Sequence, residues 1–429
     1  MMNATMSICI IIFVISLVLY GMNKLPMGVV GISTLLALVF TNCLDAKSAL
    51  TYFANNNVIM MASMFVVSAG LSRTSLIDKF SHFIMRLTGG SFKRTYACYL
   101  VLAVILTNLM NSPGACFCVV FPLAAQMCKD YDISPSKIMF PLGLVCVACC
   151  CILPFGASIQ ESGIFQGFLD TYETGLTFRP LEYTIGRWPI LILAPLWAWT
   201  IGYKIAPEKP IIPIAMTLAS SSEKKALNAF ADCAGVVIFF GVIVLFFLGN
   251  KIGVAAWQAC LLGAVLTVIC GTLTGKEAIA ALPIDLACML VGALAMAGAL
   301  TATGAGDIIG NVLAGVVGNV KNGYLLGIIF FAIPFVLTQF MQNQAVINIF
   351  APIVIMTSKA IGANPIGLLV IITAAGLTAY MTPMATSAIP IVMGAGGYDI
   401  KSLVKQSWLV SLLFGLFYVV YVMTVLPCF

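Results

Sequence analysis

A succession of apolar segments with almost no charge constrains the fold of this chain more than any other feature. Most are close to the roughly 20 residues that an α-helix needs to cross a bilayer. Only 8% of the residues are charged, against about 25% in soluble domains. The sequence therefore predicts an all-α polytopic membrane protein. The segments lie at 5–22, 27–43, 57–71, 96–128, 138–159, 188–205, 229–249, 251–272, 284–304, 323–358, 365–393 and 404–427.

Two of these segments, 96–128 and 323–358, are too long for one transmembrane helix and too short for two. Each is interrupted near its middle, at Asn111–Gly114 in the first and at Gln342–Gln344 in the second. Unpaired polar groups are costly in hydrocarbon, so such interruptions persist only where protein or water surrounds them. We interpret both segments as re-entrant hairpins of two half-helices whose tips stop near the membrane midplane.

Two more segments contain a break, at Leu153–Ser158 in 138–159 and at Thr382–Ser387 in 365–393. An unwound backbone offers carbonyl oxygens to a cation, and the N-termini of half-helices offer N–H groups to an anion. Prolines and small residues also kink helices that have no transport role. Four breaks in two matching pairs favour a binding site at membrane depth.

The chain contains an internal repeat. Leu71–Asp78 matches Leu300–Asp307, 229 residues later, and Pro154 and Ser158 match Pro383 and Ser387 at the same offset. A constant offset over most of the chain indicates a duplication. We divide the chain into a first repeat at 1–205, a cytoplasmic connector at 206–228 and a second repeat at 229–429. About ten full transmembrane helices, two hairpins and two broken helices result.

Five crossings per repeat place the second repeat upside down in the membrane, as in many secondary transporters. With the N- and C-termini outside, 15 of the 21 Lys and Arg residues fall inside, as the positive-inside rule expects. The loop at 160–187, with Glu161, Asp170, Glu173 and Glu182, then lies outside, as does Arg187. An amphipathic helix follows the third segment, and we interpret its His82 as an interfacial, solvated residue.

No acidic or basic residue lies in the middle of an apolar segment, so we expect no intramembrane Arg and no proton relay. The same absence argues against an enzyme, because no acid, base or metal-ligand cluster is placed to act. Fifteen cysteines, most of them in apolar segments, behave there as small hydrophobic residues. A soft-metal site at Cys146–Cys151 is a less favoured alternative.

The stretch Met381–Tyr398, M-T-P-M-A-T-S-A-I-P-I-V-M-G-A-G-G-Y, resembles the second broken helix of the divalent anion:sodium symporters. That family belongs to the ion transporter superfamily. The resemblance implies an inner-membrane homodimer in which each protomer has a scaffold domain and a transport domain that moves by an elevator mechanism. It also implies a small anionic substrate, a di- or tricarboxylate or sulfate, with Na⁺ as coupling ion and no other cofactor. Neither composition nor motifs suggest a nucleic-acid partner.

The resemblance and the four breaks together predict the binding residues. The second hairpin tip keeps the family's central asparagine, Asn343, whereas the first has Asn111 one place early. These departures leave the substrate and the coupling ion open. We expect substrate at Asn111, Ser112, Gly114, Ser158, Gln342, Asn343, Gln344, Thr386 and Ser387, and Na⁺ at Ser112, Gly156, Ala157, Asn343, Thr382 and Ala385.

The sequence predicts a secondary active transporter that moves a small divalent organic anion, with Na⁺ symport. An exchanger or exporter of another anion, such as sulfate or a metalloid oxyanion, is the alternative within the same superfamily. A passive anion channel would instead show flux without sodium dependence or counterflow.

Overall fold

The computed structural model describes residues 4–22, 24–75, 91–110, 113–212, 214, 227–305, 308, 322–339, 342–382, 386 and 388–429, and the regular elements among them are helices. The first half contains α1 (Ala4–Met22), α2 (Met27–Phe40), α3 (Ala46–Thr51), α4 (Asn56–Arg73), α6 (Phe92–Leu109), α7 (Pro113–Asp130), η1 (Pro135–Lys137), α8 (Met139–Ala148), α9 (Gly156–Thr171), α10 (Pro180–Arg187), α11 (Ile190–Trp197), η2 (Ala198–Gly202) and α12 (Tyr203–Ile205). The second half contains α13 (Ala229–Ile252), α14 (Ala256–Ile269), α15 (Gly275–Ala281), α16 (Ile284–Thr303), α18 (Gly323–Thr338), α19 (Asn343–Ile361), α20 (Ile366–Gly376), α21 (Ala388–Gly396) and α22 (Ile400–Val425).

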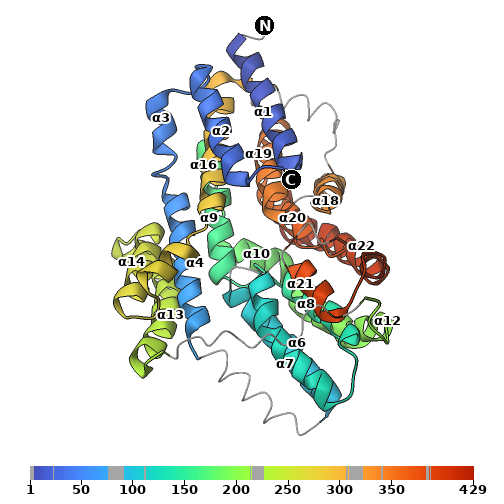
Figure 1. Ribbon diagram of the computed structural model, residues 1–429. Helices are drawn as coiled ribbons and strands as arrows, with labels where there is room; N and C mark the ends of the chain where they lie inside the picture. Colours follow the sequence, from blue (N-terminus) through green and yellow to red (C-terminus); the bar gives the residue numbers. More distant parts are fainter. Residues whose placement is uncertain are drawn as a thin grey trace.

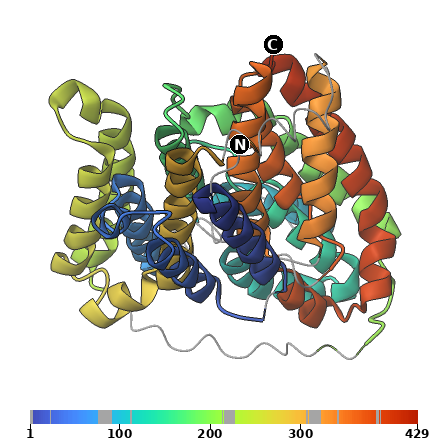
Figure 2. The same cartoon turned by 90° about the horizontal axis from the view of Figure 1, so that it is seen from above.

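Helices α1, α2, α4, α13, α14 and α16 pack together in one bundle that contains both halves of the chain. Helix α2 packs on α16, and α4 packs on α14, so each half contributes one helix to each pair. Figures 1 and 2 show α13 and α14 at one end of the molecule, with α2 and α16 nearer its middle.

Glycines allow the α2–α16 backbones to approach closely. A Cβ on Gly292 would lie 2.2 Å from the carbonyl oxygen of Gly31, and one on Gly31 would lie 2.6 Å from that of Cys288. Small residues at helix contacts in membranes permit this packing, which supplies van der Waals contact where the hydrophobic effect between helices is absent. The pair is further joined by a 2.8 Å hydrogen bond from the Gly28 amide to the Asp285 carboxylate.

A second group of helices contains the two hairpins and the two broken segments. Helix α6 packs on α7 and α18 on α19, so each hairpin segment is a helix pair around its interruption. At 1.5 Å per residue, helices of 16–19 residues measure about 24–29 Å. They are longer than the half-helices that the sequence predicted, so a tip at mid-membrane requires the outer turns to extend beyond the hydrocarbon.

The first broken segment continues further than its predicted end at residue 159. After the break, α9 runs to Thr171, and its residues from Gly156 to Phe165 are buried. The prediction of a loop over 160–187 was therefore wrong: α9 and α10 occupy most of it, and Glu161 and Arg187 are 4% and 0% exposed. A charged side chain can be buried between helices when other charged groups or backbone carbonyls pair with it.

By length and composition alone, α19 and α22 are each long and apolar enough to cross a bilayer, and ten shorter apolar helices accompany them in the described part of the chain. The predicted interfacial helix after α4, with His82, lies outside the described residues.

Candidate functional site

Asn108, near the end of α6, holds the first break in place. Its side-chain oxygen accepts hydrogen bonds from the backbone amides of Ile152 (3.0 Å) and Leu153 (2.8 Å). Its amide nitrogen donates to the carbonyl oxygens of Cys149 (3.0 Å) and Val104 (2.8 Å). Pro154 follows directly and disfavours a helical conformation at Leu153. One buried amide thus compensates the backbone groups that the break frees.

Arg187 supports the same break from α10. Its guanidinium donates to the carbonyl oxygens of Ala148 (3.0 Å), Cys150 (3.2 Å) and Cys151 (3.2 Å), which lie where α8 ends. A cation is stabilised there because the C-terminal end of a helix carries partial negative charge. Cys151 has φ of 56°, in the left-handed region that non-glycine residues occupy only when their surroundings impose it.

Three predicted residues open α9 on the other side of this break. Gly156 and Ala157 lie in its first turn, and the backbone of Phe155 before them is extended. The Ser158 hydroxyl is fully buried and donates to the carbonyl oxygens of Leu153 (2.6 Å) and Phe155 (2.9 Å). In this conformation the serine stabilises the break itself.

The second hairpin tip places three further predicted residues at the start of α19. Gln342 is exposed and extended, with ψ of 140°, and Asn343 begins the helix. The Asn343 side-chain oxygen accepts a 2.7 Å hydrogen bond from the Thr338 hydroxyl, which closes the tip. The Thr382 hydroxyl of the second break donates to the carbonyl oxygen of Gln339. The second tip and the second break are therefore in direct contact.

Gln344 connects this tip to the first half of the chain. Its side-chain nitrogen donates to the Glu161 carboxylate of α9, in line with the packing of α9 on α19. In addition, α21 packs on α7, the helix that carries the buried Gly114 in its first turn. Each half thus brings the helix after its break against the second hairpin helix of the other half.

Five further site residues were predicted at the first tip and the second break. Thr386 lies just before α21, where its hydroxyl oxygen accepts a 3.4 Å hydrogen bond from the Ala388 amide. The remaining predicted site residues, Asn111, Ser112, Ala385 and Ser387, lie outside the described residues.

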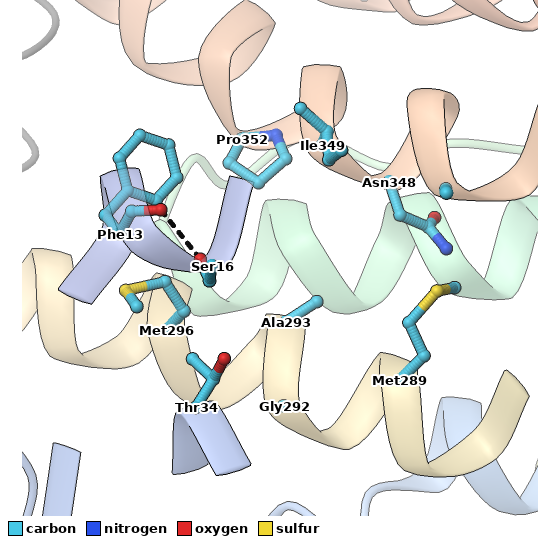
Figure 3. A pocket seen from close by; sticks show the side chains of 11 residues that line it. Phe13, Ser16, Thr34, Met289, Gly292, Ala293, Met296, Asn348, Ile349 and Pro352 are labelled. Atoms are coloured by element: carbon cyan, nitrogen blue, oxygen red, sulfur yellow. Dashed lines mark hydrogen bonds between the residues drawn. The ribbon is translucent and has the colours of Figure 1, made fainter. Parts of the chain in front are cut away.

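A cavity separates α19 from the bundle formed by α1, α2 and α16 (Figure 3). Asn348 lines it and is 4% exposed, and neither atom of its amide group has a partner within the described part of the chain. The space open to water-sized molecules is about 30 Å³, enough for roughly two waters. That volume is too small for a dicarboxylate in this conformation. The other side chains facing it are mostly apolar, among them Phe13, Met289, Met296 and Ile349.

Sequence reasoning missed Asn108, Glu161 and Arg187. Thr107 and Asn108 lie a few residues before the first tip, and the Thr107 hydroxyl donates to the Cys146 carbonyl oxygen at 2.6 Å. A polar pair close to a break was a signal for backbone support. Glu161 was assigned to a loop because α9 carries glutamine, serine and glycine as well as apolar residues. Arg187 was assigned to the same loop because the next apolar segment was predicted to begin at residue 188.

The cysteines around the first break are buried. The sulfur atoms of Cys116 and Cys146 lie 3.7 Å apart, which joins α7 to α8. No group of three or more His, Cys, Asp or Glu side chains is arranged to hold a metal ion among the residues that the structure covers.

Chemically, the site offers hydroxyl, amide and carbonyl groups, and the N-termini of α9, α19 and α21 begin at its breaks and tip. The first N–H groups of a helix have no intrahelical partners and favour anions. Carbonyl and side-chain oxygens at the breaks suit hard cations. The arrangement is suited to binding a small anion together with a cation.

Known proteins share this sequence pattern and fold. A family model described as citrate transporter (CitMHS) matches residues 11–258 and 243–429. An uncharacterized transporter of Haemophilus influenzae is 24% identical over 414 residues, which cover 92% of this chain and 86% of that protein. The sodium-dependent dicarboxylate transporter SdcS of Staphylococcus aureus is 21% identical, over 94% of this chain and 83% of its own. The YdaH transporter of Alcanivorax borkumensis has a TM-score of 0.58 at 13% identity, over 89% of both chains.

These matches confirm the resemblance inferred from the residues at the level of the ion transporter superfamily. They also confirm a membrane transport protein rather than an enzyme.

Proposed function

The chain belongs to the citrate transporter family, and we propose that it carries a small di- or tricarboxylate across the membrane as a secondary active transporter. One observation supports the location of the site. The start of α19, with Gln342, Asn343 and Gln344, lies against α9 of the other half. A substrate between these elements would meet helix N-termini from both halves, which stabilise its negative charge.

We propose Na⁺ as a coupling ion. The fit rests on oxygen donors around the tip and breaks: the hydroxyl of Thr382, the side chain of Asn343 and the backbone of Gly156 and Ala157. The name of the S. aureus relative, a sodium-dependent dicarboxylate transporter, supports the same proposal.

An elevator mechanism in a homodimer is the motion we propose. The bundle of α1, α2, α4, α13, α14 and α16 would be the scaffold, and the hairpins and broken segments would move against it. The small cavity between α16 and α19 lies along that boundary, where imperfect packing lowers the cost of sliding. The shared α2–α16 and α4–α14 pairing supports an inverted repeat.

We propose an inner-membrane location with both termini outside. The excess of Lys and Arg on the predicted inner side supports this orientation. Contacts between chain ends and loops fit the predicted alternation of sides, because each joins segments that the sequence assigns to the same side of the membrane. They are Thr5 with Cys43, Lys137 with Glu208, Arg73 with Glu277, Ile211 with Gly397, and Asn364 with Cys428.

The test is uptake of succinate, citrate and sulfate into proteoliposomes, with and without an inward Na⁺ gradient. We expect concentrative uptake of a carboxylate that requires Na⁺. Preference for sulfate or another oxyanion would favour the exchanger or exporter alternative. Downhill flux without sodium dependence or counterflow would instead identify a passive channel and refute the proposal.

A further inference from the structure

Glu161 and Gln344 form a buried acid–amide pair with one hydrogen bond made and two oxygens left over. The Gln344 nitrogen donates to Oε1 of Glu161. The second carboxyl oxygen, Oε2, and the Gln344 side-chain oxygen are both buried, and neither has a partner in the described part of the chain. Buried polar atoms are nearly always hydrogen-bonded, so each exception requires an explanation.

A proton on the Glu161 carboxyl group would give this pair a second donor, and both unpaired oxygens belong to the two groups that already contact each other. A carboxylic acid and a primary amide are planar groups, each with one donor and one acceptor side by side. When such groups lie alongside each other, the amide N–H donates to the carbonyl oxygen and the acid O–H donates to the amide oxygen. An ionised carboxylate makes only the first of these bonds and sets two acceptors against each other.

We propose that Glu161 is a proton-binding site of the transport cycle, protonated on Oε2 while it is paired with Gln344. The inference rests on the proposed transport function and adds a proton to its cycle. Protonation secures α19, and thus the second hairpin tip, to α9. Loss of the proton to water leaves a carboxylate against the Gln344 oxygen and releases the tip.

The surroundings of Glu161 favour the proton over a metal cation as the group that neutralises it. One shared proton is enough to satisfy two unpaired oxygens, whereas a hard cation requires several oxygen ligands. A buried carboxylate without a compensating partner is costly. Helices packed against α9 carry their charged side chains in their first or last turns: Arg73 in α4, Lys93 and Arg94 in α6, Glu182 and Arg187 in α10, Asp285 in α16 and Lys359 in α19.

Closer to Glu161, the groups that act on it electrostatically are Arg187, Cys150, Cys151 and Tyr183. Arg187 is the cation among them, and its hydrogen bonds go to the carbonyl oxygens of the first break and to Tyr418. Its charge is thereby shared with that backbone, and the Glu161 oxygen still lacks a hydrogen-bond donor.

Glu161→Gln is the informative variant because it preserves the geometry. The new amide accepts from Gln344 and donates to its oxygen, which imitates the protonated pair permanently. Infrared spectroscopy of the purified protein tests protonation directly. We expect the C=O stretching band of a protonated carboxylic acid in the wild type, its loss in Glu161→Gln, and its shift in Gln344→Leu. Glu173→Gln, at an exposed turn, should leave the band unchanged.

Transport provides the second readout, with Na⁺ equal on both sides and the membrane potential clamped by valinomycin and K⁺. For each proton coupled, one pH unit can support about tenfold accumulation. We expect the wild type to accumulate substrate in response to a pH gradient, and Glu161→Gln to retain substrate exchange while losing that accumulation.

Absence of a carboxylic acid band that depends on Glu161, or full pH-driven accumulation in Glu161→Gln, would overturn the inference. A band that sodium removes at constant pH would also overturn it and would assign the position to Na⁺. Failure of the proposed function gives a different result. In that case no carboxylate is transported by any variant, whereas the infrared band still reports on Glu161.

Discussion

The side-chain oxygen of Asn108 accepts a 2.8 Å hydrogen bond from the backbone amide of Leu153, the residue at which the first broken segment leaves its helix. In the second half, the equivalent positions by sequence offset, Gln339 and Thr382, are also hydrogen-bonded, through the Thr382 hydroxyl and the Gln339 carbonyl oxygen. The same contact between hairpin tip and break is thus made twice with different atoms.

Asn108→Ala should destabilise the protein by about 2–4 kcal/mol, because it leaves the buried amides of Ile152 and Leu153 without acceptors. Thermal unfolding of the detergent-solubilised protein measures the change. Asn364→Ala removes an exposed asparagine whose oxygen accepts only from the Ile366 amide at 3.0 Å, so it should have a much smaller effect. Equal shifts in the two variants would refute the role of Asn108.

Arg187→Met should cost about 3–5 kcal/mol, since three carbonyl oxygens at the first break lose a charged donor. Arg187→Lys should recover only part of this loss, because an ammonium group cannot reproduce the planar fork of a guanidinium. The melting temperature reports both. The matched control is Arg179→Lys, at an exposed position, and a lysine at 187 that restores full stability would contradict the geometry.

Gly292→Ala should separate α2 from α16. Its methyl group would lie 2.2 Å from the Gly31 carbonyl oxygen, and overpacking of this kind costs about 1–3 kcal/mol or more. Gly241 is also in a helix, but a Cβ there meets nothing within 4 Å. Gly241→Ala should therefore be neutral or slightly stabilising, and the difference between the two alanine variants in thermal unfolding is the measurement.

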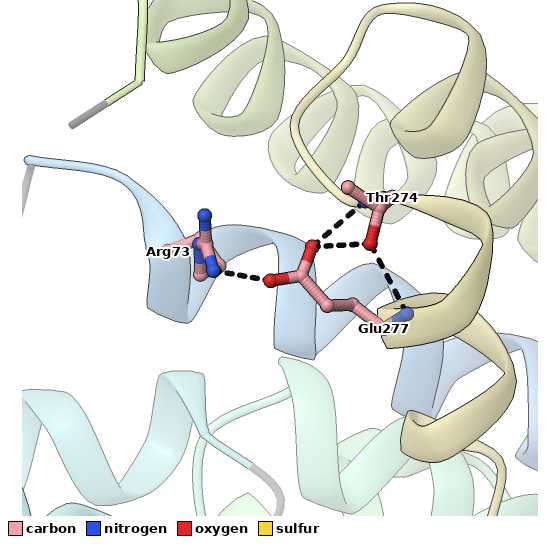
Figure 4. A network of polar contacts seen from close by, with 3 residues as sticks. All are labelled: Arg73, Thr274 and Glu277. Atoms are coloured by element: carbon pink, nitrogen blue, oxygen red, sulfur yellow. Dashed lines mark hydrogen bonds and ion pairs between the residues drawn. The ribbon is translucent and has the colours of Figure 1, made fainter. Parts of the chain in front are cut away.

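Glu277 should contribute stability that depends on pH. Hydrogen bonds from the backbone and hydroxyl of Thr274, with a further effect of Arg73, lower the pKa of this carboxyl below its usual value (Figure 4). A lowered folded-state pKa means that the stabilisation is present above the unfolded-state pKa and is lost as the pH falls through the folded-state value.

The difference in unfolding free energy between Glu277→Gln and the wild type should therefore become smaller as the pH falls below about 4.5. The side chain is partly exposed, so the effect is small. Unfolding measured from neutral to acidic pH tests it, with Glu173→Gln as a control at an exposed turn. A difference between Glu277→Gln and the wild type that stays constant with pH would refute it.

Asn343→Ala and Thr386→Ala should abolish carboxylate uptake while the protein still folds. Asn343 uses its side-chain oxygen to accept from Thr338, which directs its amide nitrogen to serve as a donor for an anion. Thr386→Ser keeps the hydroxyl that accepts from the Ala388 amide and should retain uptake. Near-normal transport by both alanine variants, with unchanged elution on size exclusion, would mean that the site lies elsewhere.

Hydropathy was sufficient to predict the helical membrane fold, because segments such as α22 are apolar along most of their length. The interruptions were also visible, since proline at 154 and amides at 342–344 are anomalous in hydrocarbon. Hairpin boundaries were accurate within a few residues: the second hairpin was predicted at 323–358, and its helices run from Gly323 to Ile361.

Side-chain partners were not predictable in the same way. A glutamate is assigned to water unless a partner is known, and the partner of Glu161 lies 183 residues away in α19. Arg187 likewise binds carbonyl oxygens about 37 residues earlier in the chain. Burial of these charges depends on tertiary contacts between segments that no local pattern relates. The site residues predicted at the first tip remain a prediction.

The packing of helices from different halves, α2 on α16 and α4 on α14, has a consequence for biogenesis. During synthesis, α2 and α4 enter the lipid long before their partners α16 and α14 are made. Until then, the glycine surfaces of the amino-terminal half remain uncovered in the membrane. We therefore expect neither half to assemble alone, and we expect the two, expressed as separate polypeptides, to reach a stable state only as a complex.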